Sequence, residues 1–323
     1  MFRKPAGFFS IERVFGQLEP ELEPFVNLKP WTAPFSGFSL VKVLRNIFAA
    51  KSCGADIYHI TGDMHYLAIG LPRKRTLLTI HDCVFLYQSS GFKRWLLKCL
   101  LLVLPVRHCA LITTISESTR KDILRFTGCA PEKVLVIPNP VDRHIRYVPR
   151  PFPATGPVLL FIGNTPNKNL LRVIPALEGI PCRLQLVGVF SSETVALLKR
   201  SSIRYEIRVN LTDQEMADQY INADIILFPS TYEGFGLPIV EGQKAGRPVI
   251  TSDLDPMREV AGGAACLVDP YSVVSIHEGV MKIISDSHYR EGLVRQGFQN
   301  VERFDAKRIA QQYLACYRQL LPA

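Results

Sequence analysis

The fold of this chain is decided by one stretch in its second half, Ala223-Asp-Ile-Ile-Leu-Phe-Pro-Ser-Thr-Tyr-Glu233-Gly-Phe-Gly-Leu-Pro-Ile-Val-Glu241. The apolar run 223–228 predicts a buried strand, and a glycine-rich turn follows it at 233–236. Pro238 then favours the first turn of a helix, where its missing N–H would have had no partner. A strand, a glycine turn and a helix N-terminus in this order predict an anion-binding cradle, because bare amide groups and the positive end of the helix dipole face the turn.

Two carboxylates flank the expected cradle, Glu233 in the turn and Glu241 near the start of the helix. Carboxylates do not suit phosphate, but they accept hydrogen bonds from hydroxyl groups such as those of a sugar or a ribose. The combination of an anion cradle with hydroxyl acceptors suggests a sugar nucleotide as the ligand.

Short apolar runs alternate with helix-length segments along most of the chain. This alternation predicts α/β architecture with parallel sheets covered by helices on both faces. Residues 20–36 are expected to form a loop, and no clear apolar strand opens the chain, where Phe8 and Phe9 stand beside Arg3, Lys4 and Pro5. The expected strands are 56–60, 76–80, 111–115, 134–137, 158–162, 184–187, 205–209, 224–228 and 248–251, and the expected helices are one from Ser10, 40–50, one from Ser116, 170–177, 191–199, 213–223 and 306–320.

Residues 143–157 contain four prolines and predict a semi-rigid linker between domains. We therefore expect two Rossmann-like, doubly wound domains that face each other across a cleft. The first would span 1–145, with a C-terminal helix of about 306–323 packing back on it, and the second would span 146–305. Ligands in such sheets bind at the carboxyl ends of the strands, where the candidate loops fall.

The composition of the 323 residues is that of a globular protein with room for two cores, with 47% hydrophobic and 21% charged residues. The net charge of +9 suits phosphorylated substrates or an anionic membrane surface. Nucleic acid is disfavoured, because zinc-ligand spacing and an aromatic–basic RNA signature are both missing. The eight cysteines include no C-x-x-C pair and predict buried thiols in a reducing cytosol. The sequence predicts neither a secretory signal nor a membrane span of about 18 residues.

Residues 223–270 resemble the signature region of the family 4 retaining glycosyltransferases of the GT-B fold. The resemblance rests on the strand, the paired glutamates with glycines between them, and the later motifs Ala245-Gly-Arg-Pro-Val249, Glu259-Val-Ala-Gly-Gly263 and Leu267-Val-Asp-Pro270. Weaker similarity extends across most of the chain and includes residues 78–82, 114–118, 138–142 and 161–169.

The resemblance implies a role for four side chains. Glu233 would contact the donor sugar near the reacting centre, and Glu241 would hold the ribose hydroxyls. Lys168 would neutralise the leaving phosphate, and His81 would approach the donor sugar from across the cleft. Cleavage of the glycosidic bond leaves extra negative charge on the nucleoside diphosphate, which a cation and a helix N-terminus stabilise more in the transition state than in the ground state. These charges take the place of a metal, so we expect neither a metal site nor any other cofactor.

The diphosphate itself is expected to bind to backbone. The resemblance implies N–H donors from the segment Phe235, Gly236 and Leu237, and a phosphate-side loop that contains Gly163 and Asn164. Asn164 is a departure from the family, because many relatives have an arginine near this point. Lys168 alone, or Lys168 with Arg247 or Arg258, would then supply the positive charge.

Each candidate also has a purely structural reading. Glu233 could be an exposed loop residue, Glu241 an acid at a helix N-terminus, and Lys168 a solvated surface lysine. His81 and Asp82 could be a strand-end pair satisfied by local backbone. Helix capping is expected for Ser116, turn formation for Asn139 and Asp142, and strand termination for Asp269. The histidines His59, His65, His108, His144, His277 and His288 have no metal-ligand spacing.

The segment 91–108 is apolar and is flanked by the basic residues Lys93, Arg94, Lys98 and Arg107. A basic, apolar helix that carries a tryptophan can lie in the surface of an anionic membrane. The alternative is a core helix of the first domain, and both hold if the lysine and arginine stems snorkel from a half-buried helix.

Together these features predict a retaining hexosyltransferase. It would move a hexose from a nucleoside-diphosphate sugar to a hydroxyl acceptor, a lipid-linked or polysaccharide precursor of the cell envelope that enters mostly from the first domain. The expected location is cytoplasmic, as a peripheral protein on the inner face of the plasma membrane. Two alternatives stay open: a sugar-nucleotide epimerase of the same fold, and a non-catalytic partner subunit that keeps the fold without the activity.

Overall fold

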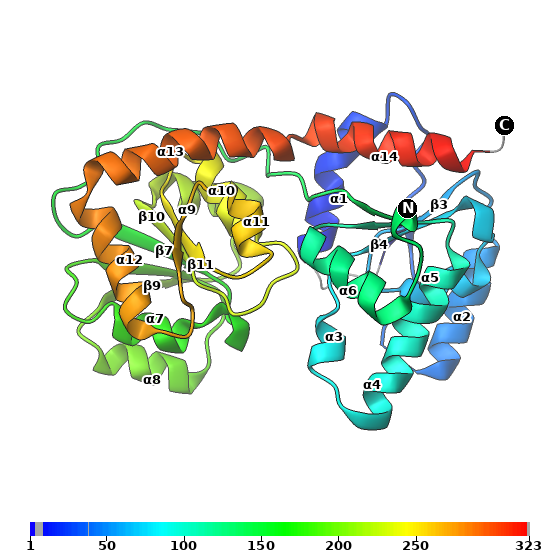
Figure 1. Cartoon of the computed structure of the whole chain (residues 1–323), viewed down its shortest axis with the longest axis horizontal. Coiled ribbons are helices and arrows are strands. Elements are labelled where there is room, and N and C mark those ends of the chain that lie inside the picture. The colour runs from blue at the N-terminus through cyan, green and yellow to red at the C-terminus, as the bar shows by residue number, and fades with distance from the viewer. Residues whose placement is uncertain (4–8, 38, 322–323) are drawn as a thin grey trace. The chain divides into compact units, whose positions relative to one another are not determined.

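The structure is a computed structural model that describes residues 1–3, 9–37 and 39–321. The chain divides into two compact units, Met1–Pro140 together with Asp305–Ala323, and Val141–Phe304 (Figure 1). Each unit contains a parallel sheet with helices on both faces, so the expected α/β class with two Rossmann-like domains is confirmed. In the described part of the chain, none of the helices combines the length and the apolar character that spanning a bilayer requires.

The first unit contains a six-stranded parallel sheet in the order β2-β1-β3-β4-β5-β6. The opening strand that the sequence left unclear is β1, a pair of residues that lies between β2 and β3. Burial on both faces explains why the central strands are apolar without alternation. The strands are β1 (Phe2–Arg3), β2 (Trp31–Thr32), β3 (Tyr58–Ile60), β4 (Thr76–Ile80), β5 (Leu111–Thr114) and β6 (Val134–Val136).

The helices of the first unit include the C-terminal helix α14, which packs against α1. A buried histidine anchors α14 to the sheet, because His59 contacts the Tyr317 hydroxyl through Nδ1 and the Thr79 hydroxyl through Nε2, each at 2.8 Å. Burial lowers the pKa of His59 well below its usual value, which keeps the ring neutral inside the core. The helices are α1 (Phe9–Leu22), α2 (Leu40–Lys51), α3 (Val84–Tyr87), α4 (Gly91–Lys98), α5 (Leu104–His108), α6 (Glu117–Thr127) and α14 (Ala306–Leu320), with 3-10 turns η1 (His65–Gly70), η2 (Arg73–Arg75) and η4 (Pro131–Lys133) and a π-helical turn η3 (Cys99–Val103).

The second unit contains a six-stranded parallel sheet in the order β12-β11-β10-β7-β8-β9. Strands β8 and β9 lie on one side of β7, and β10, β11 and β12 lie on the other, so β7 and β10 are neighbours where the strand order reverses. Such a reversal point is where Rossmann-type sheets bind their ligands. The strands are β7 (Val158–Ile162), β8 (Arg183–Val187), β9 (Arg204–Arg208), β10 (Ile225–Phe228), β11 (Val249–Ser252) and β12 (Cys266–Val268).

Helix α10 packs directly onto β10 and β11 through Gly242. A Cβ atom on Gly242 would lie 2.6 Å from Ile226 Cγ1 and 3.0 Å from Val249 Cγ2, so only glycine allows this close approach. The helices of the second unit are α7 (Leu170–Ala176), α8 (Ser192–Arg200), α9 (Asp213–Asn222), α10 (Leu237–Lys244), α11 (Met257–Ala261), α12 (Val273–Ser285) and α13 (Ser287–Val301), with 3-10 turns η5 (Pro166–Lys168) and η6 (Glu302–Phe304).

Most of the expected elements are confirmed to within two residues, and 158–162 and 306–320 match the bounds of β7 and α14. The loop expected at 20–36 is wrong at both ends, because α1 extends to Leu22 and Trp31–Thr32 joins the sheet as β2. The proline-rich segment 143–157 belongs to the second unit instead of linking two units. There the ring of Tyr147 packs edge-to-face against that of Phe298, with 5.0 Å between the ring centroids. Arg150 forms an ion pair with Asp224 at 3.1 Å.

The segment 91–108 has two halves that differ in burial. Its first half is α4, whose side chains Phe92, Trp95 and Leu96 are exposed. Its second half is η3 and α5, where Leu102 and Val106 are fully buried. The core-helix reading therefore holds for 99–108, whereas 91–98 is an exposed helix for which membrane binding stays a prediction.

Candidate functional site

The loops that follow β7 and β10 lie next to each other, because these two parallel strands are paired through Ile225 and Leu159 and through Ile226 and Leu160. The first loop spans 163–169 and the second spans 229–236. Both leave the carboxyl edge of the sheet at the point where the strand order reverses. Strand order therefore brings together two segments that are far apart in the sequence.

Asparagines tie these two loops together. Asn167 accepts a backbone hydrogen bond from Thr231 N at 2.8 Å, and its side-chain amide donates to the Tyr232 carbonyl at 2.8 Å. The buried Asn169 amide donates to the Pro229 carbonyl at 3.0 Å and to the Pro270 carbonyl at 2.6 Å. Neither Asn167 nor Asn169 was identified from the sequence, where an asparagine in a loop indicates only a turn.

Lys168 and Glu233 meet between the loops. Lys168 Nζ donates to Glu233 Oε1 at 2.6 Å, and the ammonium group also lies 4.8 Å from the centroid of the Phe228 ring. Asn167 Nδ2 lies 3.3 Å from the same carboxylate oxygen. Both charged side chains are mostly buried, which makes the pair stronger than a solvated surface pair. The structure thus contradicts the readings of Glu233 as an exposed loop residue and of Lys168 as a solvated lysine.

Gly163 determines where the Lys168 side chain lies. Its φ of +102° lies in a region that side-chain-bearing residues rarely adopt, and a Cβ there would meet Lys168 Cγ and Cε at 2.9 Å each. The aliphatic stem of Lys168 therefore packs on the bare backbone of Gly163. Asn164 follows as an exposed residue whose amide donates to the Val189 carbonyl at 2.6 Å, which connects this loop to the segment after β8.

Helix α10 begins at the second loop in the way the sequence predicts. Gly236 is its N-cap with a φ of +106°, Leu237 is the first helical residue, and Pro238 follows in the first turn. Phe235 is buried and its ring packs edge-on against Phe304 at 5.6 Å, so this side chain is structural while its backbone lies at the helix N-terminus. The first amide groups of a helix have no intrahelical acceptor and carry partial positive charge.

Glu241 lies deeper in the same helix and is almost fully buried. The buried Tyr220 hydroxyl on α9 donates to Glu241 Oε2. A buried carboxylate needs hydrogen-bond donors, and Tyr220 supplies one of them from a neighbouring helix. Tyr220 was missed at the sequence level, where it reads as one more apolar position on the inner face of helix 213–223.

The two arginines considered as helpers of Lys168 are engaged elsewhere. Arg247 is buried at the C-terminal end of α10, opposite the end that faces the loops, and donates to the Val148 and Ile221 carbonyls at 2.8 Å each. Arg258 pairs with Asp253 at 2.9 Å and with Asp255 at 3.3 Å, and these contacts raise its pKa. The suggestion that Arg247 assists at the phosphate is therefore wrong. The charge of Arg258 is already paired with the carboxylates of Asp253 and Asp255.

His81 lies in the first unit, directly after β4 at the carboxyl edge of that sheet. Its Nε2 atom lies 2.8 Å from the Thr61 carbonyl, and the Phe15 ring packs edge-on against it. The adjacent Asp82 accepts a hydrogen bond from Val84 N at 2.9 Å, and burial raises the pKa of Asp82. These contacts agree with the strand-end reading of the pair, and the role that the resemblance implies for His81 stays a prediction.

Three polar residues are confirmed as local structural elements. Ser116 caps α6 by accepting a hydrogen bond from Thr119 N at 3.2 Å. Asp142 accepts from His144 N at 2.8 Å, as expected of a turn residue. Asp269 directly follows β12, as expected of a residue that ends a strand, and accepts from Tyr271 N at 2.9 Å.

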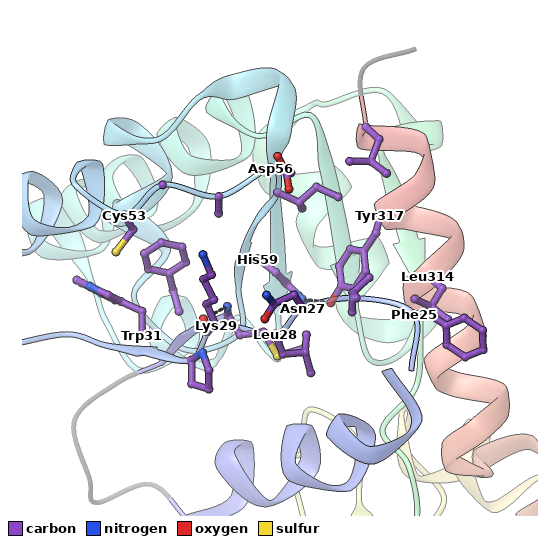
Figure 2. A pocket seen from close by; sticks show the side chains of 18 of the residues that line it. Phe25, Asn27, Leu28, Lys29, Trp31, Cys53, Asp56, His59, Leu314 and Tyr317 are labelled. Carbon is purple, nitrogen blue, oxygen red and sulfur yellow. Dashed lines mark hydrogen bonds between the residues drawn. The ribbon is translucent and has the colours of Figure 1, made fainter. Parts of the chain in front are cut away.

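A separate hollow of about 1030 Å³ lies in the first unit, and Figure 2 shows it from close by. It lies at the amino ends of the strands, because Lys29 and Asp56 on its wall precede β2 and β3. This edge is opposite the one at which parallel sheets bind ligands, and no predicted site residue lines the hollow. In the described ranges of the chain, His, Cys, Asp and Glu side chains form no group of three suited to a metal ion.

Comparisons with known proteins agree on one family. The model "Glycosyltransferase Family 4" matches residues 8–144, and "Glycosyl transferases group 1" matches residues 148–300. The O-antigen chain mannosyltransferase B of Escherichia coli is 27% identical over 310 residues, which cover 88% of this chain and 79% of that protein. The O-antigen chain mannosyltransferase RfbU of Salmonella typhimurium is 25% identical over 250 residues, which cover 73% of this chain and 69% of that protein. The structure of Anabaena Alr3699/HepE in complex with UDP and glucose aligns with this chain at a TM-score of 0.80 and 17% sequence identity. The alignment covers 98% of each chain, and at this identity it shows a shared fold.

Proposed function

The chain belongs to the family 4 glycosyltransferases of the GT-B fold, and from this premise we propose that it is a retaining hexosyltransferase that uses a nucleoside-diphosphate sugar. The observation that carries the proposal is the Lys168–Glu233 pair at 2.6 Å beside the N-terminus of α10. A cation, a helix N-terminus and a carboxylate within one pair of loops suit a ligand that is anionic at one end and rich in hydroxyl groups at the other.

Each residue of the proposed site has a distinct task. The amide groups at Gly236 and Leu237 bind the diphosphate, and Lys168 neutralises the charge that develops on the leaving phosphate. Glu233 accepts hydrogen bonds from the hydroxyls of the donor sugar, and Glu241 accepts those of the ribose. These protein charges stabilise the leaving group, so the proposed mechanism requires neither a metal nor another cofactor. Gly163 and Asn164 shape the loop that presents Lys168.

In the proposed reaction the bond between the anomeric carbon and the phosphate oxygen breaks, and its electrons leave with the nucleoside diphosphate. The acceptor hydroxyl bonds to the anomeric carbon on the same face and passes its proton to the departing phosphate. The configuration of the sugar is thereby retained. The role of His81 in this step is part of the proposal and rests on the resemblance alone.

The relatives point to the substrate class. Those reported above are O-antigen chain mannosyltransferases, so we propose mannose as the hexose and a glycan of the cell envelope, polymeric or lipid-linked, as the acceptor. This acceptor class also favours a peripheral position on the cytoplasmic face of the plasma membrane. The first unit, in which the family model for residues 8–144 lies, is proposed to bind the acceptor.

A thermal-shift screen of nucleoside diphosphates and their hexose conjugates tests the donor. A ligand at ~100 times its dissociation constant adds ~2.7 kcal/mol to the free energy of unfolding, which gives a clear rise in melting temperature. We expect the nucleoside diphosphate of one base to raise the melting temperature, both on its own and as its hexose conjugate. A chain that responds to none of these compounds would contradict the proposal.

Activity measurements separate the proposed enzyme from its two alternatives. A transferase releases the nucleoside diphosphate in step with glycosylation of an acceptor, whereas an epimerase interconverts two sugar nucleotides and releases none. A non-catalytic partner subunit does neither, and substitutions at Lys168 or Glu233 would leave the assembly's turnover unchanged.

Tyr220→Phe is expected to weaken binding of the nucleoside diphosphate by roughly tenfold, because a hydrogen bond to a buried charged group is worth more than one to a neutral group. Without the hydroxyl, Glu241 loses a donor that orients its carboxylate towards the ribose. Since the ribose stays bound in ground and transition state alike, we expect KM to rise and kcat to stay nearly constant. Calorimetric titration with the nucleotide, together with steady-state kinetics, measures both.

Tyr147→Phe provides the matched control for this substitution. It removes the same hydroxyl in the same unit, from a ring that packs against Phe298 and Gly246 beyond the C-terminal end of α10. Equal loss of affinity in both variants, or a fall in kcat at constant KM for Tyr220→Phe, would argue against the positioning role.

A further inference from the structure

The hollow of about 1030 Å³ in the first unit is lined by none of the residues of the proposed transfer site (Figure 2). Its walls come mainly from three segments: the loop between α1 and β2, the loop before β3, and the last turns of α14. Figure 2 shows Trp31 and Cys53 at one end of the hollow and Leu314 and Tyr317 of α14 at the other. Its volume is at the upper end of the range for pockets that hold a small organic molecule.

Hydrogen bonds hold the walls of the hollow in place. The Tyr58 hydroxyl donates to the Cys53 carbonyl at 2.8 Å, which fixes the loop before β3. Trp31 N donates to the Met1 carbonyl at 2.8 Å, which joins the end of the loop before β2 to the start of β1. On the third side, the buried His59 ties α14 to the sheet. The hollow is therefore formed before any ligand enters it, as is usual for small-molecule sites.

The lining of the hollow is mostly apolar. Its two buried polar side chains, His59 and Tyr317, contact each other at 2.8 Å, so these polar groups already have partners. Burial also lowers the pKa of His59, so the ring carries no charge at neutral pH. The large apolar side chains of the lining are Phe2, Phe25, Leu28, Trp31, Leu314 and Leu321. A lining rich in aromatic rings favours a ligand whose body is aromatic.

Several of these apolar side chains are still open to solvent. Phe25 is exposed at 65% and Leu321 at 47%. Trp31 is half-buried, although its ring packs against that of Phe2 with 4.9 Å between the centroids. Single exposed apolar side chains are common on protein surfaces, but a group of them around a hollow is typical of a binding site. An apolar molecule in the hollow would remove their remaining surface from water.

The charged residues of the lining are more positive than negative. Lys29 and Arg318 supply two cations, and Asp56 supplies one carboxylate. All three residues are exposed, so they lie where the hollow opens to solvent. Among the described residues, neither cation is paired with a carboxylate. The excess of unpaired positive charge favours a ligand that carries an anionic group.

We propose that this hollow is a second ligand site, which binds an aromatic molecule that carries one anionic group. The aromatic body packs against the apolar lining, and the anionic group lies at the opening beside Lys29 and Arg318. The site lies at the amino ends of the strands of the first sheet, so it is separate from the loops that follow β7 and β10. Binding at this site does not depend on the proposed transferase activity.

Two fluorescent probes with the same ring system test the charge requirement. Anilinonaphthalene sulfonate carries one anionic group, and phenylnaphthylamine is the same aromatic body without it. Fluorescence titration of the full chain should show saturable binding of both probes. Lys29→Gln/Arg318→Gln should weaken binding of the sulfonate roughly tenfold and leave the neutral probe unchanged, because only the anion interacts with these charges.

The carboxylate on the wall gives a test in the opposite direction. Asp56→Asn should strengthen binding of the sulfonate by roughly twofold to fivefold, because it removes a repulsion at an exposed position, and should leave the neutral probe unchanged. Lys42→Gln/Arg45→Gln is the matched charge control. It also neutralises one exposed lysine and one exposed arginine of the first unit, on α2, and should alter the affinity for neither probe.

Phe25→Ser/Leu321→Ser tests the apolar lining. It should weaken binding of both probes by roughly tenfold, because the ring system covers these side chains whether or not it carries a charge. The matched control is Phe48→Ser/Leu44→Ser on α2, which makes the same two changes in the same unit at nearly the same exposure, 67% and 45%. The control should bind both probes like the parent chain. Parent-like melting temperatures of all variants would show that they fold.

Alkylation of cysteines locates the bound probe. Cys53 lines the hollow, whereas Cys129 is not part of the lining, and both are half-buried in the first unit. With the sulfonate at ~10 times its dissociation constant, about nine-tenths of the sites are occupied, so alkylation of Cys53 should slow by roughly tenfold. Alkylation of Cys129 should keep its rate. Peptide mass spectrometry measures both rates in the same sample.

Four results would overturn the proposal. The first is the absence of saturable binding of the sulfonate to the parent chain, and the second is a matched control that loses as much affinity as the variant of the hollow. The third is alkylation of Cys53 at an unchanged rate in the presence of the sulfonate. The fourth is a loss of sulfonate binding in Lys168→Ala, because the probe would then bind at the loops of the second unit.

Discussion

Lys168→Ala is expected to lower kcat by roughly 10²–10³-fold, which is the usual cost of removing one preorganised group that stabilises developing negative charge. The ammonium group lies 2.6 Å from Glu233 Oε1 and beside the N-terminus of α10, where the leaving phosphate is proposed to lie. The variant also leaves the mostly buried Glu233 carboxylate without its cation, so the repulsion between this carboxylate and the diphosphate increases. Nucleoside-diphosphate affinity and turnover should therefore both fall.

Steady-state kinetics and calorimetric titration measure the two effects of Lys168→Ala. Lys199→Ala, which removes an exposed lysine from the last turn of α8 in the same unit, is the matched control and should behave like the parent chain. Lys168→Arg keeps the charge but places a larger planar group against Gly163, so we expect only partial activity. Parent-like turnover in Lys168→Ala would remove Lys168 from the mechanism and would favour a non-catalytic role for the chain.

Glu233→Gln is expected to lower kcat by on the order of 10²-fold or more, because the amide keeps the shape of the side chain but loses the charge and one of its acceptor oxygens. The donor-sugar hydroxyls would then lack the partner that orients the sugar for transfer. At the same time Lys168 loses its counter-ion, and its full charge becomes available to phosphate. We therefore expect the nucleoside diphosphate to bind roughly two- to fivefold more tightly, which is the size of effect typical of a partly exposed ion pair.

The opposite directions of these two effects make Glu233→Gln a sharp test. A residue that merely supports the loop would, when replaced, weaken turnover and nucleotide binding together. Glu278→Gln on α12 makes the same chemical change at an exposed position and should alter neither quantity. Weaker nucleotide binding in Glu233→Gln would mean that the carboxylate acts on loop structure and not on the sugar.

Much of the site could be predicted because its signals are local. The apolar strand, the glycines and Pro238 occupy one short stretch, and the structure realises that stretch as β10, a turn and α10 with Gly236 at the N-cap. The positive φ at position 236 and the close packing at position 242 both require glycine. These requirements are local, so the two glycines can be recognised in the sequence.

The errors arise where packing competes with composition. The prolines of 143–157 suggested a semi-rigid linker between domains, yet Tyr147 and Arg150 contact the second unit through Phe298 and Asp224. Arg247 looked available for phosphate, but α10 carries it to the far end of the helix, where two backbone carbonyls accept its hydrogen bonds. A two-residue strand such as β2 has too few side chains to show the alternation of apolar and polar residues that marks a strand. Residues 20–36 were therefore predicted to be a loop.

The sequence alone determined the alternation of strands and helices and the loops that carry Lys168 and Glu233, because these depend on residues within one or two turns of each other. Only the tertiary structure decided that Lys168 meets Glu233, that Tyr220 supports Glu241, and that His59 anchors α14 to the first sheet. Each of these depends on a choice among many possible partners: β7 pairs with β10, α9 packs near α10, and His59 contacts Tyr317 and Thr79. Such choices minimise the free energy of the whole chain, so no short window of residues contains the information that selects them.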